Sequence, residues 1–305
     1  MDGLDSARIR ALRSPKPRHD PWSAQGLAVE QEPQPDGTTA RALTVFLTGA
    51  ECPFTCVFCD LWRHTLDEPT PPGAIPRQIR AALAAPEAAG ATTIKLYNAS
   101  NYFDRRAVPA EDDTEVARLV GGFRRVVVEA HPKLVGRRCR TFIERLGAAT
   151  LEVAMGFESL HPWALERSGK GVTVDDLRRA AARLREWGAA LRAFVLIGAP
   201  FVPAAERVAS TVETVETALA LGAVRVSLVP VRGGNGALDV LRRRGSWHPP
   251  TLDEVEATLA RCLPLAPNRV AVDPWDLEAL ADPSRPDDAA RVERLRRLAA
   301  GEVSA

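Results

Sequence analysis

Three cysteines lie close together in the chain, as Cys52-x3-Cys56-x2-Cys59. Thiolates at this spacing are metal ligands, but three of them do not complete a structural zinc site, which takes four protein ligands. A [4Fe–4S] cluster has four irons, and each needs a ligand besides its sulfides. Three cysteines would hold three irons and leave the fourth open to a small molecule. The motif therefore predicts a metal position for chemistry rather than for scaffolding.

Two plainer interpretations of these thiols are a disulfide and a zinc site. A disulfide is disfavoured because the five cysteines are an odd number, and because the start Met-Asp-Gly-Leu-Asp has no signal-peptide character. Zinc would need a fourth ligand, for which His64 is the nearest candidate. The iron–sulfur interpretation is favoured over both. The single Cys139 and Cys262 are expected to be small buried hydrophobic residues.

The composition bounds the class of protein. With 305 residues, 46% of them hydrophobic, the chain can bury a large core and suits one α/β barrel. No apolar run reaches the roughly 18 residues of a membrane span, so we expect no membrane partner. The formal charge of +1 gives no strong footprint for nucleic acid, although it does not exclude a local basic patch. An oxygen-sensitive cluster is best kept in a reducing compartment, which favours the cytoplasm.

From Arg41 onward, short β-rich runs alternate with amphipathic helical stretches. The clearest helical stretch is 173–187, where Thr173 and Asp176 resemble a capping box and Gly188 ends the helix. Such alternation implies parallel strands joined by right-handed crossovers. The β-rich runs cover residues 42–48, 93–97, 125–129, 151–156, 192–197 and 225–229. We therefore predict an α/β fold, a partial (β/α)6 TIM-type barrel.

Three regions are expected along the chain. Residues 1–40 are predicted to be a flexible or irregular arm, because their proline-rich polar runs show neither a helical nor a strand period. Residues 41–250 should form the barrel core. Residues 251–305 should form a small α/β extension that packs on the barrel, with helical patterns at 251–263 and 287–300 around a short strand that begins near Arg269.

The cysteine loop, with aromatic Phe58 before its third cysteine, resembles the cluster loop of the radical S-adenosylmethionine (radical SAM) superfamily. Residues 156–173, 193–201 and 245–250 are similar to the elongator-like branch of that superfamily. Within it, the chain looks closest to the archaeosine-synthesis radical SAM lyases and their uncharacterised bacterial relatives. The resemblance implies a [4Fe–4S] cluster whose open iron binds SAM. Reductive cleavage of SAM then releases a 5′-deoxyadenosyl radical that abstracts hydrogen from a substrate.

Further SAM contacts are expected on loops at the carboxyl ends of the strands, where parallel α/β barrels carry their reactive groups. The resemblance places Phe58 beside the adenine, with a core position under the loop as the alternative. Relatives bind the SAM amino group through Gly-Gly-Glu at the end of the second strand. Here that tripeptide is replaced by a segment in which Asn98, Ser100 and Asn101 are candidate acceptors. An ordinary polar turn is the alternative for these three residues.

The fourth and fifth predicted strands carry the remaining cofactor candidates. Glu158, followed by Ser159, matches the family's ribose-contacting element, because a carboxylate can accept hydrogen bonds from the sugar hydroxyls. Leu196, Ile197 and Gly198 match in character the apolar strand end that meets the adenine in relatives. A surface carboxylate and a core strand are the corresponding alternatives.

Two more candidates flank the substrate side of the predicted site. His131 follows the third strand and is a candidate catalytic residue, because its imidazole titrates near neutrality; a structural role is the alternative. Gly233, Gly234 and Gly236 follow the sixth strand and would permit a ligand to approach the backbone closely.

These observations predict a radical SAM enzyme that acts on an unknown small-molecule or nucleoside substrate, including a tRNA base, by lysis, rearrangement or modification. An electron donor such as flavodoxin or ferredoxin would be its redox partner. The alternative is a non-catalytic iron–sulfur or zinc binding protein on the same barrel. The sequence does not identify the substrate, the reductant or the oligomeric state, nor whether SAM is consumed or regenerated.

Overall fold

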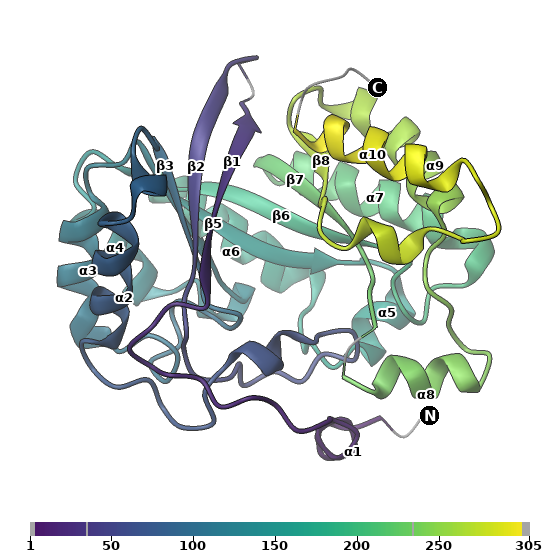
Figure 1. The fold of residues 1–305 in the computed structure, drawn as a ribbon, viewed down its shortest axis with the longest axis horizontal. Helices are drawn as coiled ribbons and strands as arrows, with labels where there is room; N and C mark the ends of the chain where they lie inside the picture. The colour runs from purple at the N-terminus through teal and green to yellow at the C-terminus, as the bar shows by residue number, and fades with distance from the viewer. Residues whose placement is uncertain (1–3, 35, 234, 301–305) are drawn as a thin grey trace.

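A single curved sheet organises the protein (Figure 1). The computed structural model describes residues 4–34, 36–233 and 235–300. The sheet follows chain order from β1 to β8. β2 to β8 pair in parallel, and β1 pairs with β2 in the antiparallel sense. The strands are β1 (Gly26–Pro33), β2 (Thr39–Phe46), β3 (Thr93–Tyr97), β4 (Arg125–Glu129), β5 (Thr150–Glu158), β6 (Ala190–Ile197), β7 (Ala223–Pro230) and β8 (Val270–Val272).

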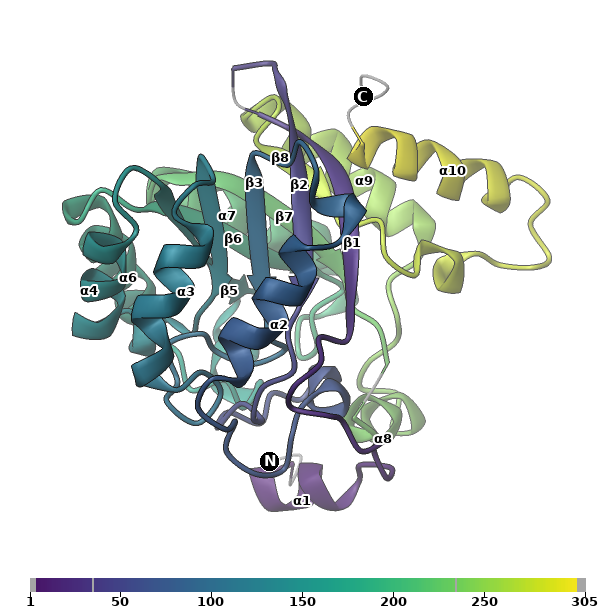
Figure 2. The same cartoon turned by 60° about the vertical axis from the view of Figure 1, so that its left-hand side comes forward.

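Helices cover the convex side of the sheet, and Figure 2 shows α2, α3 and α4 side by side outside the first parallel strands. The expected partial TIM-type barrel is confirmed, and β8 extends its parallel sheet beyond the six predicted strands. The helices are α1 (Ser6–Ala11), α2 (Ala74–Leu83), α3 (Asp113–Val120), α4 (Arg137–Arg145), α5 (Pro162–Arg167), α6 (Val174–Glu186), α7 (Arg207–Ala220), α8 (Ala237–Arg243), α9 (Leu252–Cys262) and α10 (Asp288–Ala299).

Local sequence explains the best-predicted helix. Thr173 is the N-cap of α6, and its side chain and that of Asp176 form the reciprocal bonds of a capping box. Leu177 and Leu184 are fully buried on the inner face of this helix. The C-terminal helices α9 and α10 also form where the pattern predicted them.

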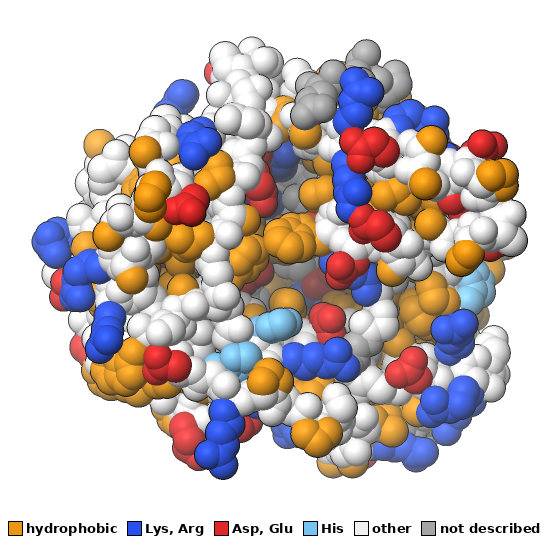
Figure 3. Space-filling view, in the orientation of Figure 1, with side chains coloured by type: hydrophobic (Ala, Val, Ile, Leu, Met, Phe, Trp, Pro, Cys, Tyr) orange, Lys and Arg blue, Asp and Glu red, His pale blue; other side chains and the backbone are white. Residues whose placement is uncertain are grey.

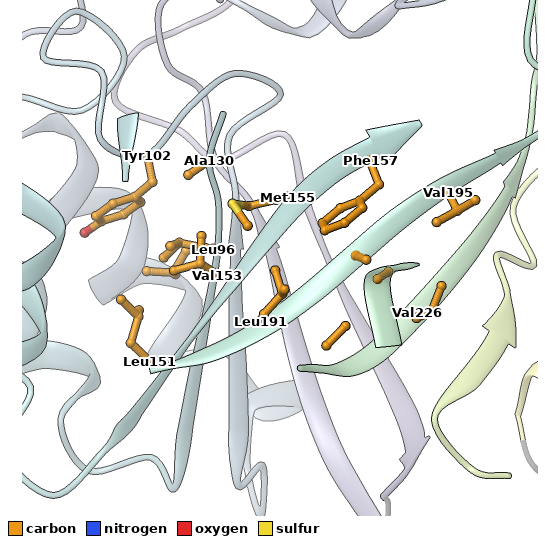
Figure 4. Packing of buried hydrophobic residues seen from close by; sticks show 14 of the residues in the cluster. Leu96, Tyr102, Ala130, Leu151, Val153, Met155, Phe157, Leu191, Val195 and Val226 are labelled. Atoms are coloured by element: carbon orange, nitrogen blue, oxygen red, sulfur yellow. The ribbon is translucent and has the colours of Figure 1, made fainter. Parts of the chain in front are cut away.

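Successive side chains of β5 point to opposite faces of the sheet. Val153, Met155 and Phe157 belong to the hydrophobic core cluster (Figure 4). Side chains two apart in a strand share a face, so Glu152 belongs to the opposite, inner face. A register shift between Gly156 and Glu158 interrupts the alternation before Glu158. Glu158 ends the strand at its carboxyl end, whereas Glu152 lies near its start.

A buried ion network occupies the inner face near the strand starts. Arg192 donates to both oxygens of Glu32, at 2.8 and 3.0 Å, and to Glu152 at 2.5 Å. Lys95 contacts Glu32 at 3.0 Å, and Arg225 lies 3.5 Å from it. Burial by itself would raise the pKa of Glu32, but the three cations outweigh it and hold this pKa far below its usual range. Mutual pairing is what allows these charges to be buried.

The prediction of a flexible or irregular arm for residues 1–40 is wrong where α1 and the strands form, whereas residues 12–25 contain neither helix nor strand. Every residue of β1 pairs with β2. Glu32 of β1 also enters the ion network. β1 forms a hairpin with the adjacent β2, whereas Arg192, the partner of Glu32, lies 160 residues away. Local strand preference is weak in this segment and does not reveal either contact. The division into regions at residues 40 and 250 stays a prediction.

No helix in the described part of the chain is long and apolar enough to cross a membrane.

Candidate functional site

The three cysteines lie on the loop that follows β2, at the carboxyl end of the first parallel strand. Two bonds hold this loop in the middle: Val57 donates its N–H to the Ser168 carbonyl at 2.8 Å, and Asn235 donates Nδ2–H to the Cys56 carbonyl at 2.8 Å. Asn101 donates Nδ2–H to the sulfur of Cys52 at 3.1 Å. The loop is therefore held by segments that follow three other strands.

The N-terminal segment holds the same loop from outside. Arg13 pairs with Glu51 at 2.7 Å, and its guanidinium lies 4.8 Å from the centre of the Trp62 ring. In α1, Ile9 is buried in one hydrophobic cluster with Val57 of the cysteine loop and Leu238 of α8. Figures 1 and 2 both show α1 beside α8 at this end of the barrel. The segment thus forms part of the site's outer wall.

Desolvation favours the neutral form of all three thiols. It raises the pKa of Cys56 to about 12, raises that of Cys52, and raises that of Cys59 well above its ordinary value. The ammonium of Lys170 acts in the opposite direction on Cys52 and Cys56. Buried thiols of this kind ionise when a metal supplies the compensating charge.

The donor set fits an iron–sulfur cluster in its chemistry. Three thiols share one loop, a side-chain N–H is directed at the sulfur of Cys52, and a buried ammonium lies nearby. Within the described ranges, no three His, Cys, Asp or Glu side chains are grouped as a ready-made metal site.

A small pocket lies beside the loop, and four of the expected cofactor residues line it: Phe58, Glu158, Ser159 and Leu196. They come from the cysteine loop and from the ends of β5 and β6. Figure 3 shows the molecule hollowed at the centre of the face that Figure 1 presents, with acidic, basic and histidine side chains at the margin. Tertiary structure thus brings together residues that are far apart in the sequence.

An ion pair that the sequence did not predict forms part of this pocket. Lys170 contacts the Oε1 atom of Glu158 at 2.6 Å, and both side chains are largely buried. Burial alone would lower the pKa of Lys170, but Glu158 and the thiols outweigh it and raise this pKa. Glu158 has a φ of 57°, a left-handed conformation that costs energy in a non-glycine residue. A Cβ atom at Gly156 would lie 1.9 Å from Oε1 of Glu158 and 2.4 Å from Nζ of Lys170, so a side chain there would displace this pair.

The candidates after β3 lie apart from this pocket. Asn98 is fully buried, and neither polar atom of its side chain has a hydrogen-bond partner; the Oγ of Ser100 is likewise buried and unpartnered. Unsatisfied buried polar atoms are costly and indicate a missing partner such as water or a ligand. Asn101 is instead fully engaged between Cys52 and the backbone N–H of His131. At the end of β4, burial raises the pKa of Glu129 to about 7.

His131 is enclosed rather than exposed in the pocket. Its ring stacks on Phe54 of the cysteine loop, with 3.7 Å between ring centres, and its Nε2 atom lies 3.1 Å from the Lys170 carbonyl. Burial, followed by the charge of Lys170, lowers the pKa of His131 to about 4. A neutral ring in this position supports the loop, and its catalytic assignment stays a prediction.

Of the apolar candidates at the end of β6, Leu196 lines the pocket, whereas Ile197 and Gly198 pack against other parts of the protein. Ile197 is fully buried in the core. Gly198 has a φ of 76°, its carbonyl accepts a bond from Trp247 at 2.8 Å, and a Cβ atom there would lie 2.9 Å from Pro250. Gly236 packs against the backbone of Leu12, while Gly234 lies outside the described residues.

The fold and the site together describe a partial parallel α/β barrel with a three-cysteine loop at the carboxyl end of its first parallel strand. No known family model matches the chain. In sequence, it is 21% identical over 165 residues to the uncharacterized protein MJ0550 of Methanocaldococcus jannaschii, and the alignment covers 52% of this chain and 45% of that protein.

Solved structures share the fold. An archaeal Elp3 from Methanocaldococcus infernus, lacking residues 1–46, matches 73% of this chain and 59% of its own at a TM-score of 0.54 and 16% identity. Streptococcus suis SuiB bound to S-adenosylmethionine matches 74% of this chain and 48% of its own at 0.53 and 12%. The chain thus spans about half the length of these relatives. These likenesses show that the chain shares the fold of both proteins.

Proposed function

We propose that this chain is a radical SAM enzyme. Cys52, Cys56 and Cys59 would hold a [4Fe–4S] cluster, and SAM would bind in the adjoining pocket. The observation that carries the proposal is the convergence of Phe58 and Glu158 on one pocket beside the cysteine loop. When bound and reduced, the cluster supplies the electron that cleaves SAM, which leads to hydrogen abstraction from the substrate.

The residues of this chain would divide the work of binding between them. Phe58 and Leu196 offer apolar surfaces to the adenine. The Oε2 atom of Glu158 has no hydrogen-bond partner among the described residues, so it is left to accept from ribose hydroxyls while Oε1 is held by Lys170. The unpartnered Oδ1 of Asn98 and Oγ of Ser100 would accept hydrogen bonds from the SAM amino group.

We also propose a substrate class, an electron donor and a cellular location. The substrate would be a small molecule or a nucleoside, including a tRNA base, and a flavodoxin or ferredoxin would deliver the electron. A cytoplasmic location would protect the cluster from oxygen. The surrounding contacts of Arg13 and α1 would limit the access of solvent to the cysteine loop.

Anaerobic reconstitution with iron and sulfide tests the proposal. The reduced protein should give a [4Fe–4S] paramagnetic resonance signal that shifts on addition of SAM. The Cys56→Ala variant should lose stable cluster loading, whereas Cys139→Ala, which removes a core thiol, should keep it. A cluster signal indifferent to SAM would favour a non-catalytic iron–sulfur protein, and zinc retained in place of iron would favour a zinc protein.

Glu158→Ala provides an independent test of the pocket. Loss of a hydrogen bond to a charged group costs about 1.5–3 kcal/mol, so SAM should bind roughly 10-fold or more weakly while iron content is unchanged. Glu166→Ala, which removes an exposed carboxylate on α5, should bind SAM normally. Unchanged SAM affinity in Glu158→Ala would remove the ribose assignment.

A further inference from the structure

A second pocket, outside the candidate site, is lined mainly by arginine side chains. It lies between the loop that follows β3 and helix α4. Its charged lining residues are Arg105, Asp113, Arg137, Arg138 and Arg145. Four cations and one anion leave three positive charges without compensation in the lining. A cavity of this composition attracts an anion.

The single carboxylate of the pocket is already engaged. Asp113 is buried and accepts from the Nε and Nη2 atoms of Arg138, both at 2.8 Å. Arg145 approaches the same carboxylate at 3.9 Å. Within the described part of the chain, Arg105 and Arg137 have no acidic side chain within ion-pair distance. These two guanidinium groups are therefore available to a ligand.

A buried nitrogen of Arg138 also indicates a missing ligand. Its Nη1 atom is buried and has no hydrogen-bond partner, although its other nitrogens are bonded. A buried donor left without a partner costs free energy, and a charged one costs more. Helix α4 also begins with Arg137 and Arg138, has no acidic residue in its first turn, and has no side-chain cap at Gly136. Positive side chains at a helix N-terminus are unfavourable unless an anion joins them.

We propose that this pocket binds a phosphate group. A phosphate presents several oxygens to the planar, fork-shaped donors of arginine, and Arg–phosphate pairs are often bidentate. Arg105 and Arg137 would contact it from opposite walls, with Nη1 of Arg138 at the base. The hydroxyl of Thr141, which also lines the pocket, adds an uncharged donor.

The position of the pocket suggests what carries the phosphate. Arg105 lies on the loop that begins with Asn98 and includes Asn101, which bonds to Cys52. Helices α3 and α4 both begin after the carboxyl ends of their strands, so the pocket opens at the same end of the barrel as the cysteine loop. The phosphate would then belong to the substrate, an assignment that rests on the proposed function, whereas phosphate binding itself does not.

Calorimetric titration of the whole 305-residue chain with pyrophosphate, with and without reconstituted iron, tests the inference. The wild type should bind, and Arg137→Ala and Arg105→Ala should each bind about 10-fold or more weakly, because each removes a charge-assisted contact. Arg140→Ala is the matched control: this exposed arginine on α4 pairs with Glu144 and does not line the pocket. Its affinity should stay within about twofold of the wild type.

Two results would overturn the inference: no binding by the wild type, or equal weakening in Arg140→Ala and Arg137→Ala. Titrations with orthophosphate and adenosine monophosphate identify the source of the group. Tighter binding of the nucleotide supports a nucleotide phosphate, and equal binding supports a free phosphate. Because these titrations contain no SAM, their outcome is independent of the SAM-induced resonance shift that tests the proposed function.

Discussion

Adding a methyl group at Gly169 should disturb the cysteine loop while leaving the rest of the fold intact. Gly169 has a φ of 73°, and a Cβ atom there would lie 2.5 Å from the carbonyl oxygen of Thr55, the residue before Cys56. Its neighbour Ser168 accepts the N–H of Val57 at 2.8 Å. Gly171 is a matched control, because it has a φ of 65° and open space around its Cβ position.

The magnitude follows from the two costs involved. Both Gly169→Ala and Gly171→Ala force alanine into the left-handed region, which costs about 1–2 kcal/mol. Ordinary contacts begin at 3.4 Å, so only Gly169→Ala must also move the Thr55 carbonyl by about 0.9 Å (3.4 minus 2.5) or distort around it. Overpacking of this kind adds about 1–3 kcal/mol. The difference between the two variants should therefore be about 1–3 kcal/mol, located at the cysteine loop.

Two assays together examine this reasoning. Denaturant unfolding followed by circular dichroism should give Gly169→Ala the lower free energy of unfolding. Iron bound per chain after reconstitution should fall in Gly169→Ala and stay at the wild-type level in Gly171→Ala. Equal stability and equal iron content in the two variants would refute the claim that close packing of residues 168–170 positions the thiols.

Three further predictions concern other parts of the molecule. Arg192→Met should lower the free energy of unfolding by about 3–5 kcal/mol in a denaturant titration, because Glu32 keeps its buried charge and loses its bidentate partner; a change below 1 kcal/mol would contradict the network's role. Burial raises the pKa of Glu129 to about 7, so its contribution to stability is present below the unfolded value near 4.3 and is lost as the pH rises through about 7. The free energy of unfolding of Glu129→Gln, relative to the wild type, should therefore rise by about 2 kcal/mol from pH 4 to pH 8, a value reduced for partial solvent access, and a constant difference would exclude this. Arg13→Met should lose reconstituted iron faster in air, measured with a chelator, with under about 1 kcal/mol change in stability because its pair with Glu51 is partly exposed; an unchanged rate would separate the N-terminal segment from protection of the loop.

The predictions that held depend on short-range patterns. The capping box at Thr173 and the β-rich runs are both readable within a few residues, and each follows a local geometric rule. The predicted convergence of Phe58 and Glu158 used a further rule, that parallel strands bring their carboxyl ends to one edge. Their assignments as SAM contacts stay predictions.

The features that were missed depend on partners distant in the chain. Glu32 joins an ion network because Arg192, 160 residues away in the chain, lies beside it, and residues 26–33 carry no signal of that contact. The sequence did not predict the ion pair of Lys170 with Glu158, because that pair forms only when the loop after α5 returns over the strand end. Arg13 gave no signal either, since its contact with Glu51 joins segments 38 residues apart.

The sequence by itself determined the thiol motif and the alternation of strands and helices from Arg41 onward. These indicate the end of the barrel at which chemistry should occur, because they follow from local periodicity and from the handedness of parallel connections. Only the tertiary structure decided which side chains share a pocket, which charges are compensated, and that Asn98 and Arg138 keep buried polar atoms without partners. Burial and distance set the energy of a charge or a hydrogen bond, and both are properties of the folded chain rather than of residue order.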